Sequence, residues 1–386
     1  MDTLEQVLPR MNMTEQNTRG LAGVVAAETG LSFIDGAEGR LWYRGFDVHA
    51  LAKHASYLES VYLLWYDALP AAIELSAFEG TLARQRALPP AVLDALRCLP
   101  ADAAPMAALR TAVSALGQVD PEADDISHEA DLRKAGRLVA QLPTIVATFD
   151  RFRRDLDPVD PDPELDHAAN FLYMLSGTRP SETAARALDT SWLLYLEHGL
   201  NASTFTTRVV ASTLADMHSA ITAGISALKG PLHGGANEKA MEMLLEIGTA
   251  GSVPSFVDTA LEQKQKIMGF GHRVYRTEDP RATHLRRMAE ELSLEAGDSR
   301  WYDVSRRLEV EMLERKGLHC NVDFYCATVY YSLGLSIDLF TPLFAVGRTA
   351  GWAAHVMEQH MHNKLIRPRA EYTGELDRPW VPIDRR

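Results

Sequence analysis

Three glycine-flanked polar segments stand out in the second half of the chain, at 230–237, 268–275 and 321–325. They supply two histidines and one carboxylate, namely His233, His272 and Asp323. A glycine beside a polar residue lets the backbone and a ligand approach closely. A carboxylate base with two histidine hydrogen-bond donors could remove a proton next to a carbonyl group and stabilise the resulting enolate.

His233 precedes a helix that the sequence predicts to begin near Asn237. The positive end of that helix disfavours the imidazolium form, and a neutral imidazole can donate a hydrogen bond to a carbonyl oxygen that is becoming an enolate. The alternative is a buried structural histidine in a tight turn, the commoner role of an isolated histidine. The glycine-rich setting and the two other segments favour the catalytic interpretation.

Asp323 and His272 can each be interpreted either as a functional residue or as a structural one. The apolar neighbours of Asp323 would raise its pKa and make it a better base, whereas its commonest structural role would be a helix N-cap. His272 is followed within ten residues by arginines at positions 273, 276 and 281, a set that suits an anionic ligand. The alternative for these arginines is a solvated basic helix start.

Other polar residues give weaker signals. His198 and Asn201 offer polar groups at a predicted helix end, and Arg348 lies among small residues where a ligand could approach. Arg367 and Arg369 form a second anion-binding candidate, or else a solvated loop.

The elements that must position these residues are mostly helical. Residues 30–45 predict a short hairpin, because two β-prone runs flank a glycine-rich turn. A helix is predicted to begin near Ser181 and to end at Gly199, which places His198 in its last turn. Further single helices are predicted over 203–228, 282–294 and 325–362, and acidic surface loops over 119–127 and 155–164. The fold class is therefore all-α with a minor hairpin.

Composition limits the function classes. The chain has 386 residues, a net charge of −13 and 46% hydrophobic residues, which indicates a soluble globular protein without the basic footprint of nucleic-acid binding. The three cysteines, Cys98, Cys320 and Cys326, match no metal motif and suggest a reducing compartment. Residues 1–6 do not resemble a signal peptide, and no segment predicts a membrane span. We expect a cytoplasmic protein.

The glycine-flanked segments together resemble the citrate synthase family. The resemblance runs from about residue 20 to about residue 374 and is strongest in six ordered segments: 197–203, 230–237, 268–281, 321–325, 344–351 and 364–374. The length and the compact N-terminus are similar to the shorter bacterial and archaeal type. The family fold implies three segments: a large helical domain over 1–232, a small helical domain over 233–334, and a return to the large domain over 335–386.

The resemblance implies an acyltransferase of the tricarboxylic acid cycle that condenses acetyl-CoA with oxaloacetate. Asp323 matches the base that takes the methyl proton of acetyl-CoA. His233 matches the residue that stabilises the enol, and His272 matches the one that polarises the oxaloacetate carbonyl. No metal or other cofactor is implied.

The same resemblance assigns the binding residues. Oxaloacetate would be held by His198, Asn201, Arg281, Arg348 and Arg367, and CoA by Arg276 and Arg369. In the family, the arginine matching Arg367 comes from the second subunit of a homodimer. The exposed-looking tail around Trp380 also suggests a docking segment.

Three alternatives remain open at this point. A 2-methylcitrate synthase would use propionyl-CoA with the same residues. A zinc or iron hydrolase would use His198, His233 and His272 as ligands, but these residues lack compact metal-site spacing. A helical scaffold without activity would leave the glycine-flanked segments without a role.

Overall fold

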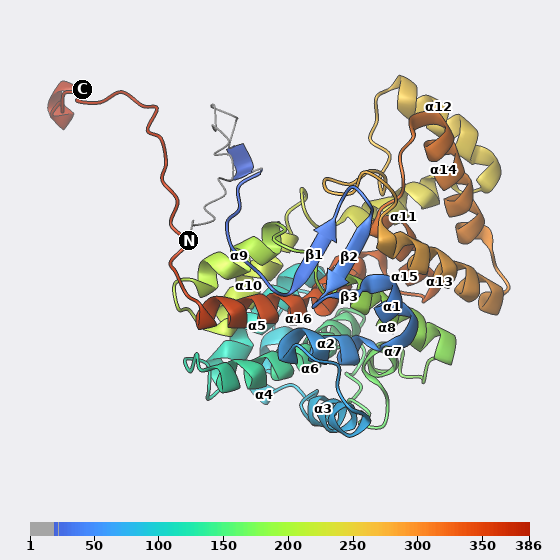
Figure 1. The fold of residues 1–386 in the computed structure, drawn as a ribbon, viewed down its shortest axis with the longest axis horizontal. Coiled ribbons are helices and arrows are strands. Elements are labelled where there is room, and N and C mark those ends of the chain that lie inside the picture. The colour runs from blue at the N-terminus through green and yellow to red at the C-terminus, as the bar shows by residue number, and fades with distance from the viewer. Residues whose placement is uncertain (1–18, 22) are drawn as a thin grey trace, which may run out of the picture. The chain divides into compact units, whose positions relative to one another are not determined.

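The computed structural model describes residues 19–21 and 23–386. They contain sixteen α-helices, four short 3₁₀-helices and one three-stranded sheet, which confirms the all-α prediction with a minor hairpin (Figure 1). The chain divides into two compact units, residues 1–30 and residues 31–386, and the second carries every candidate site residue. The prediction about a signal peptide at residues 1–6 lies outside the described residues.

The predicted hairpin is present and gains a third strand. Strands β1 (Ser32–Asp35), β2 (Arg40–Tyr43) and β3 (Phe46–Asp47) form an antiparallel sheet in that order. The Asp35 side chain stabilises the β1–β2 turn, because its Oδ1 accepts hydrogen bonds from the backbone N–H groups of Ala37 and Glu38, each at 3.0 Å.

The helices follow the sheet without further strands in the described part of the chain. The first eight are α1 (Val48–His54), α2 (Tyr57–Tyr66), α3 (Ala72–Arg84), α4 (Pro90–Arg97), α5 (Pro105–Val119), α6 (His128–Arg153), α7 (His167–Ser176) and α8 (Glu182–Tyr195). The next eight are α9 (Ala202–Ala211), α10 (Met217–Leu228), α11 (Ala236–Ile247), α12 (Val253–Glu262), α13 (Pro280–Ala296), α14 (Arg300–Lys316), α15 (Val322–Ser332) and α16 (Phe340–Met361). The 3₁₀-helices are η1 (Arg19–Leu21), η2 (Ala250–Ser252), η3 (Ile337–Leu339) and η4 (Ile383–Arg385).

Helix α16 forms the centre of the core. It packs against α6, α8, α9 and α10, and its residues are buried on all sides over most of its length, as expected of a central helix. Small residues permit these close approaches. A Cβ added to Gly347 of α16 would lie 3.1 Å from Cα of Trp192 on α8. Helix α15 packs instead against α11 and α13, and Figure 1 shows α11 to α14 gathered on one side of α16.

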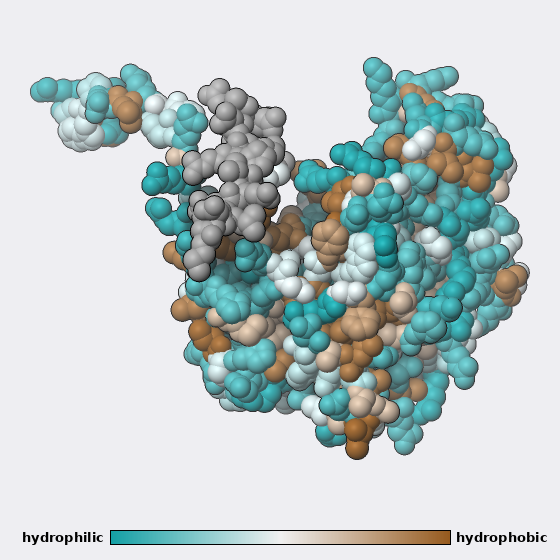
Figure 2. All heavy atoms as spheres, viewed as in Figure 1, coloured by the Kyte–Doolittle hydropathy of each residue, from teal (hydrophilic) through white to brown (hydrophobic). Residues whose placement is uncertain are grey.

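The surface agrees with this burial pattern. On the face in Figure 2, most exposed atoms belong to hydrophilic residues, and hydrophobic residues appear in separate patches. Among the described residues, no helix combines the length and the hydropathy that a membrane span requires. The predicted acidic loops 119–127 and 155–164 contain neither helix nor strand, except that Val119 is the last residue of α5.

Three helix predictions were wrong in their extent. The stretch 203–228 is two helices, because Leu214 adopts a left-handed conformation at φ +64° and Asp216 caps the start of α10. The stretch 325–362 is also divided, between α15 and α16, at Gly334 with φ +74°. Both breaks use residues favoured at helix ends.

The third correction changes where a candidate site residue lies relative to its helix. Helix α8 ends at Tyr195 rather than at Gly199, so His198 follows the helix and does not lie in its last turn. Glu197, the second residue after the helix end, is fully buried and bonded to other elements. These tertiary bonds draw the chain away from the helix axis, which local propensity could not predict.

Candidate active site

Two short backbone segments bring His272 close to Asp323. The N–H of Gly271 donates to the carbonyl of His319, and the N–H of Asn321 donates to the carbonyl of Gly269, both at 2.9 Å. Gly269 has φ +83°, and a Cβ there would lie 2.8 Å from the Phe324 side chain. The glycine is therefore required for this approach, and it joins two of the three segments found in the sequence.

Asp323 stands at the second position of α15, and the cap role belongs to a neighbour. Asn321 is the N-cap, and its Oδ1 accepts a hydrogen bond from the Asp323 N–H at 3.1 Å. The Asp323 carboxylate accepts a hydrogen bond from the Tyr195 hydroxyl at 3.2 Å. Burial raises the pKa of Asp323, while Arg281 and Tyr195 act in the opposite direction. A carboxylate with a raised pKa is a stronger base.

His233 is neutral and has a defined tautomer. Its Nε2 accepts a hydrogen bond from the backbone N–H of Ser203 at 3.2 Å, so the ring proton must be on Nδ1. The Ser203 hydroxyl lies 2.8 Å from the same nitrogen. Burial and the charge of Arg348 lower the pKa of His233 to about 4. At neutral pH the ring can therefore donate a hydrogen bond from Nδ1.

His272 has the opposite tautomer. Its Nδ1 accepts hydrogen bonds from the N–H groups of Val274 and Tyr275, at 3.0 and 3.1 Å, which leaves the proton on Nε2. Burial and the charge of Arg281 lower the pKa of His272 to about 4. The His272 ring lies edge-on to His198, with 5.4 Å between ring centroids. Two neutral histidines, His233 and His272, therefore each present one ring N–H donor.

His198 is fixed by two neighbouring residues. Its Nε2 lies 3.0 Å from the Tyr275 hydroxyl, and burial together with Arg281 and Arg348 holds its pKa well below the ordinary value. The turn that carries it is set by Glu197, whose Oε1 accepts a hydrogen bond from the Gly199 N–H at 2.6 Å. The same oxygen lies 3.1 Å from Nε2 of His355 on α16.

Two buried arginines supply positive charge. Arg281 forms a bidentate pair with Asp279, with N–O distances of 2.9 and 2.8 Å, and Asp279 also accepts the Val322 N–H at 3.1 Å. Arg348 is 2% exposed and donates from Nε to the carbonyl of Tyr195. Both charges influence His198 and Asp323, so the structure brings these four predicted residues together. Such a site suits a small ligand with carboxylates.

The other four predicted binding residues are placed differently from the two buried arginines. Asn201 caps α9 and accepts the hydroxyl of Ser203 at 2.8 Å, so it supports the partner of His233. Arg276 is exposed in the loop after His272. Arg367 and Arg369 are exposed after α16, and neither side chain forms a hydrogen bond or ion pair within the described residues.

The sequence interpretation missed several residues that position the site: Tyr195, Glu197, Ser203, Tyr275 and Asp279. Tyr275 and Asp279 lie inside the conspicuous 268–281 segment, so their location was a usable signal. Tyr195 gave no such local signal. Its contact with Asp323 joins residues 128 positions apart, and no local pattern predicts it.

The three histidines do not form a metal cluster. Among the described residues, the group with ligand atoms close enough to share an ion is Glu278, Glu309 and Cys320. Arg286 donates to both of these carboxylates, so an ion-pair network accounts for that group. The geometry gives no support to a hydrolase that uses His198, His233 and His272 as ligands.

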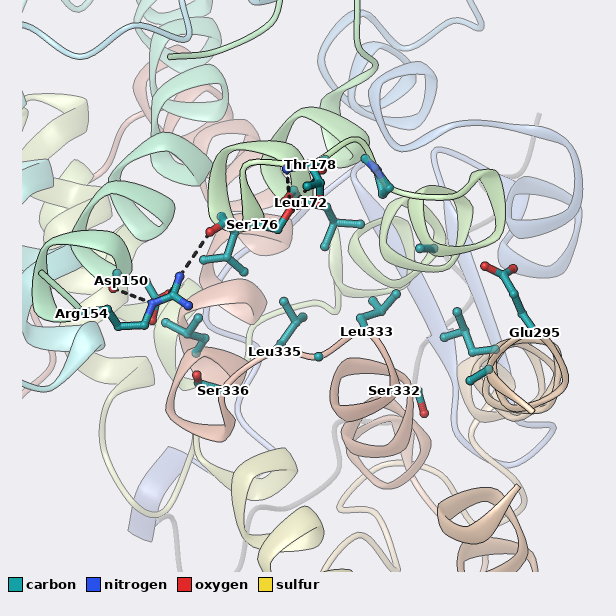
Figure 3. Close-up of a pocket in the computed structure, with 17 residues that line it drawn as sticks. Asp150, Arg154, Leu172, Ser176, Thr178, Glu295, Ser332, Leu333, Leu335 and Ser336 are labelled. Atoms are coloured by element: carbon teal, nitrogen blue, oxygen red, sulfur yellow. Dashed lines mark hydrogen bonds and ion pairs between the residues drawn. The ribbon is translucent and has the colours of Figure 1, made fainter. Parts of the chain in front are cut away.

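A separate cavity of about 410 Å³ lies away from these residues (Figure 3). Leucines such as Leu172, Leu333 and Leu335 line it together with polar groups such as Arg154 and Glu295. None of the predicted site residues contributes to it.

Comparison with known proteins identifies the family. Residues 20–369 match the family described as citrate synthase, C-terminal domain. The chain belongs to the citrate synthase family. It is 50% identical to the citrate synthase of Haloferax volcanii over 379 residues, which cover 97% of this chain and all of the relative. It is also 43% identical to the 2-methylcitrate synthase of Shewanella oneidensis, over 95% of this chain and 97% of the relative.

A solved structure supports the same assignment within the citrate synthase family. The ternary complex of citrate synthase from Thermoplasma acidophilum with carboxymethyl coenzyme A and oxaloacetate has a TM-score of 0.90. It is 34% identical in sequence, and the match covers 96% of this chain and all of that one. The fold predicted from the sequence resemblance is thus confirmed.

Proposed function

We propose that the protein is a citrate synthase, an acyltransferase that condenses acetyl-CoA with oxaloacetate and water to give citrate and CoA. The proposal rests on the opposite tautomers of two neutral histidines and on a half-buried carboxylate, that of Asp323, which Arg348 influences together with His233. His233 offers Nδ1–H and His272 offers Nε2–H, while Asp323 offers a basic oxygen. This arrangement suits an enolate on one substrate and a polarised carbonyl on the other.

In the first step, Asp323 removes a proton from the methyl carbon of acetyl-CoA. The electron pair of the broken C–H bond moves toward the thioester oxygen, which His233 stabilises by donating a hydrogen bond from Nδ1. The ring is neutral at pH 7 because its pKa is about 4. A neutral donor can stabilise the developing charge, as in other enolising enzymes.

In the second step, the enolate carbon attacks the carbonyl carbon of oxaloacetate, and the carbonyl oxygen takes up a proton, which balances the one removed by Asp323, to become the hydroxyl group of the citryl thioester. His272 donates from Nε2 to the carbonyl oxygen, and His198 helps to hold the substrate. Arg281 and Arg348 bind its carboxylates, with Arg367 of a second subunit as a third cation. Water then hydrolyses the citryl thioester, and CoA leaves with the thiol proton.

The remaining binding roles follow from position. Arg276 and Arg369 are exposed cations suited to the phosphates of CoA. Asn201 acts on oxaloacetate indirectly, because its side chain caps α9 and bonds Ser203. Residues 233–334 form the small domain, which closes on substrate against 1–232 and 335–386 and excludes water from the enolate.

Assembly, location and cofactor use are parts of the same proposal. We infer a homodimer, since Arg367 and Trp380 are exposed beyond the last long helix and available to a second subunit. We infer a cytoplasmic location from the free thiols of all three cysteines. No metal is required, because histidine N–H groups supply the electrophilic assistance; excess EDTA should leave the rate unchanged.

The experiment compares kcat/KM for acetyl-CoA and propionyl-CoA at saturating oxaloacetate, by following thiol release. One methylene changes binding by only roughly 1–3 kcal/mol, so we expect acetyl-CoA to be preferred and propionyl-CoA to be turned over measurably. A tenfold or greater preference for propionyl-CoA would identify a 2-methylcitrate synthase with the same mechanism.

A further inference from the structure

The turn of the N-terminal hairpin contacts the loop that carries His272. The backbone N–H of Arg276 donates to the carbonyl of Gly36 at 2.8 Å. A Cβ added to Gly36 would overlap the Val274 carbonyl oxygen, and one added to Gly39 would overlap the Thr277 hydroxyl. The two backbones therefore touch directly, which only glycine permits at these positions.

The same hairpin also contacts the turn that carries His198. The Ser32 hydroxyl donates to Oε1 of Glu197 at 3.0 Å, and that oxygen also accepts the Gly199 N–H. Ile34 reaches Gly199, since a Cβ added there would lie 3.5 Å from its Cδ1. One β-hairpin therefore touches both loops whose histidines face each other.

Hydrogen bonds hold the hairpin at both of its ends. Asp35 closes its turn with two hydrogen bonds. At its other end, Tyr43 is fully buried, and its hydroxyl lies 3.3 Å from the carbonyl oxygens of Leu193 and Leu194 on α8. The hairpin is thus fastened to the helix that leads into the His198 turn.

The loop of residues 272–278, by contrast, has no helix or strand of its own. Two consecutive N–H groups, of Val274 and Tyr275, point at Nδ1 of His272 and so select its tautomer. The next N–H, of Arg276, is the one bound by Gly36. The contact with the hairpin therefore fixes the N–H group of Arg276, which directly follows the two N–H groups that donate to His272.

We propose that the β1–β2 turn is a positioning element for His272, acting through the contact of Gly36 with Val274 and Arg276. This inference rests on the proposed function, in which Nε2–H of His272 polarises the oxaloacetate carbonyl. Gly36 does not touch substrate. It holds the loop so that the peptides of Val274 and Tyr275 keep Nδ1 as the acceptor and Nε2 as the donor.

The test is Gly36→Ala, with Gly251→Ala as its matched control. Neither glycine has a positive φ, so each substitution adds only a methyl group, and at Gly251 the nearest atom to that group is 3.9 Å away. At Gly36 the methyl group must displace the Val274 backbone. We expect kcat/KM for oxaloacetate to fall by on the order of tenfold or more, because small displacements of catalytic groups are costly. The thermal midpoint should stay close to that of Gly251→Ala.

A second readout separates positioning from loss of folding. In protein labelled with ¹⁵N-histidine, the ring signals of His272, identified by their loss in His272→Gln, should change in Gly36→Ala and stay unchanged in Gly251→Ala. Asp35→Ala, which loosens the turn without adding bulk, should lower kcat/KM for oxaloacetate in the same direction. It serves as the deciding variant if Gly36→Ala does not fold.

The inference is overturned if folded Gly36→Ala shows wild-type kinetics and unchanged His272 signals. If Gly36→Ala does not fold, the same result in Asp35→Ala overturns it. Failure of the proposed function would give a different result. In that case the wild-type protein itself would release no thiol in the presence of oxaloacetate.

Discussion

The hydroxyl of Tyr195, the last residue of α8, donates a hydrogen bond to Oδ1 of Asp323 in the first turn of α15, at 3.2 Å. The bond joins the proposed base to a helix from a distant part of the chain. It favours the ionised carboxylate and so lowers the pKa of Asp323, whereas burial raises it. The basicity of Asp323 is therefore a balance between burial and the opposing effects of Arg281 and Tyr195.

Tyr195→Phe should shift that balance. The ring can keep its packing against Phe344, 4.3 Å away between centroids, but the hydrogen bond is lost. Loss of this bond removes an interaction that favours the ionised carboxylate, so the pKa of Asp323 should rise. The acidic limb of the kcat profile should move to higher pH in the same direction. Tyr62→Phe is the control, and identical profiles for both variants would show that the bond does not tune the base.

Asp323→Asn keeps the size of the side chain but removes the proton acceptor. We expect kcat to fall by on the order of 10²-fold or more, as for the loss of a general base. Oxaloacetate binding, measured by calorimetry, should change little because Arg281 and Arg348 are untouched. Asp303→Asn removes a carboxylate from the first turn of α14 and should leave kcat unchanged. A near wild-type kcat for Asp323→Asn would remove the residue from the mechanism.

His167 should make stability depend on pH. It is 2% exposed, both ring nitrogens lack a hydrogen-bond partner, and burial with Arg86 lowers its pKa to about 3. Because the unfolded chain binds the proton near pH 6.5, this residue stabilises the fold fully above that pH and loses its contribution as the pH falls toward 3. Between pH 7 and pH 5 the loss is about 2 kcal/mol.

His167→Phe should therefore reduce the fall in the free energy of unfolding between pH 7 and pH 5, measured by urea denaturation. His362→Phe changes an exposed histidine and should leave the fall as in wild type. The account of His167 is wrong if both variants show the wild-type dependence on pH.

The proposed role of Arg367 in a neighbouring subunit predicts complementation. Asp323→Asn and Arg367→Ala should each be nearly inactive alone. In a mixed dimer, the subunit with intact Asp323 receives Arg367 from its partner, so one site is complete. Dissociation and reassembly of an equal mixture should restore about a quarter of wild-type activity, with half of the dimers mixed and one complete site in each. If Arg367 serves its own subunit, no activity returns.

Local signals in the sequence were enough for much of this structure. Ser181 and the residues before Asn237 marked helix starts correctly, because caps and glycines act within a few residues. The end of α8 was not predictable in this way, since Glu197 bonds to Ser32 and His355, both more than 150 positions away. The contacts of Tyr195 with Asp323 and of Gly36 with Arg276 likewise depend on the complete fold.

Thiol release from acetyl-CoA, measured with and without oxaloacetate, distinguishes condensation of the two substrates from simple hydrolysis of the thioester. We expect CoA to appear only when oxaloacetate is present, because the enolate formed by Asp323 needs the carbonyl held by His272. The rate should not change in excess EDTA. Equal release without oxaloacetate, or loss of activity in EDTA that zinc restores, would contradict the proposed function.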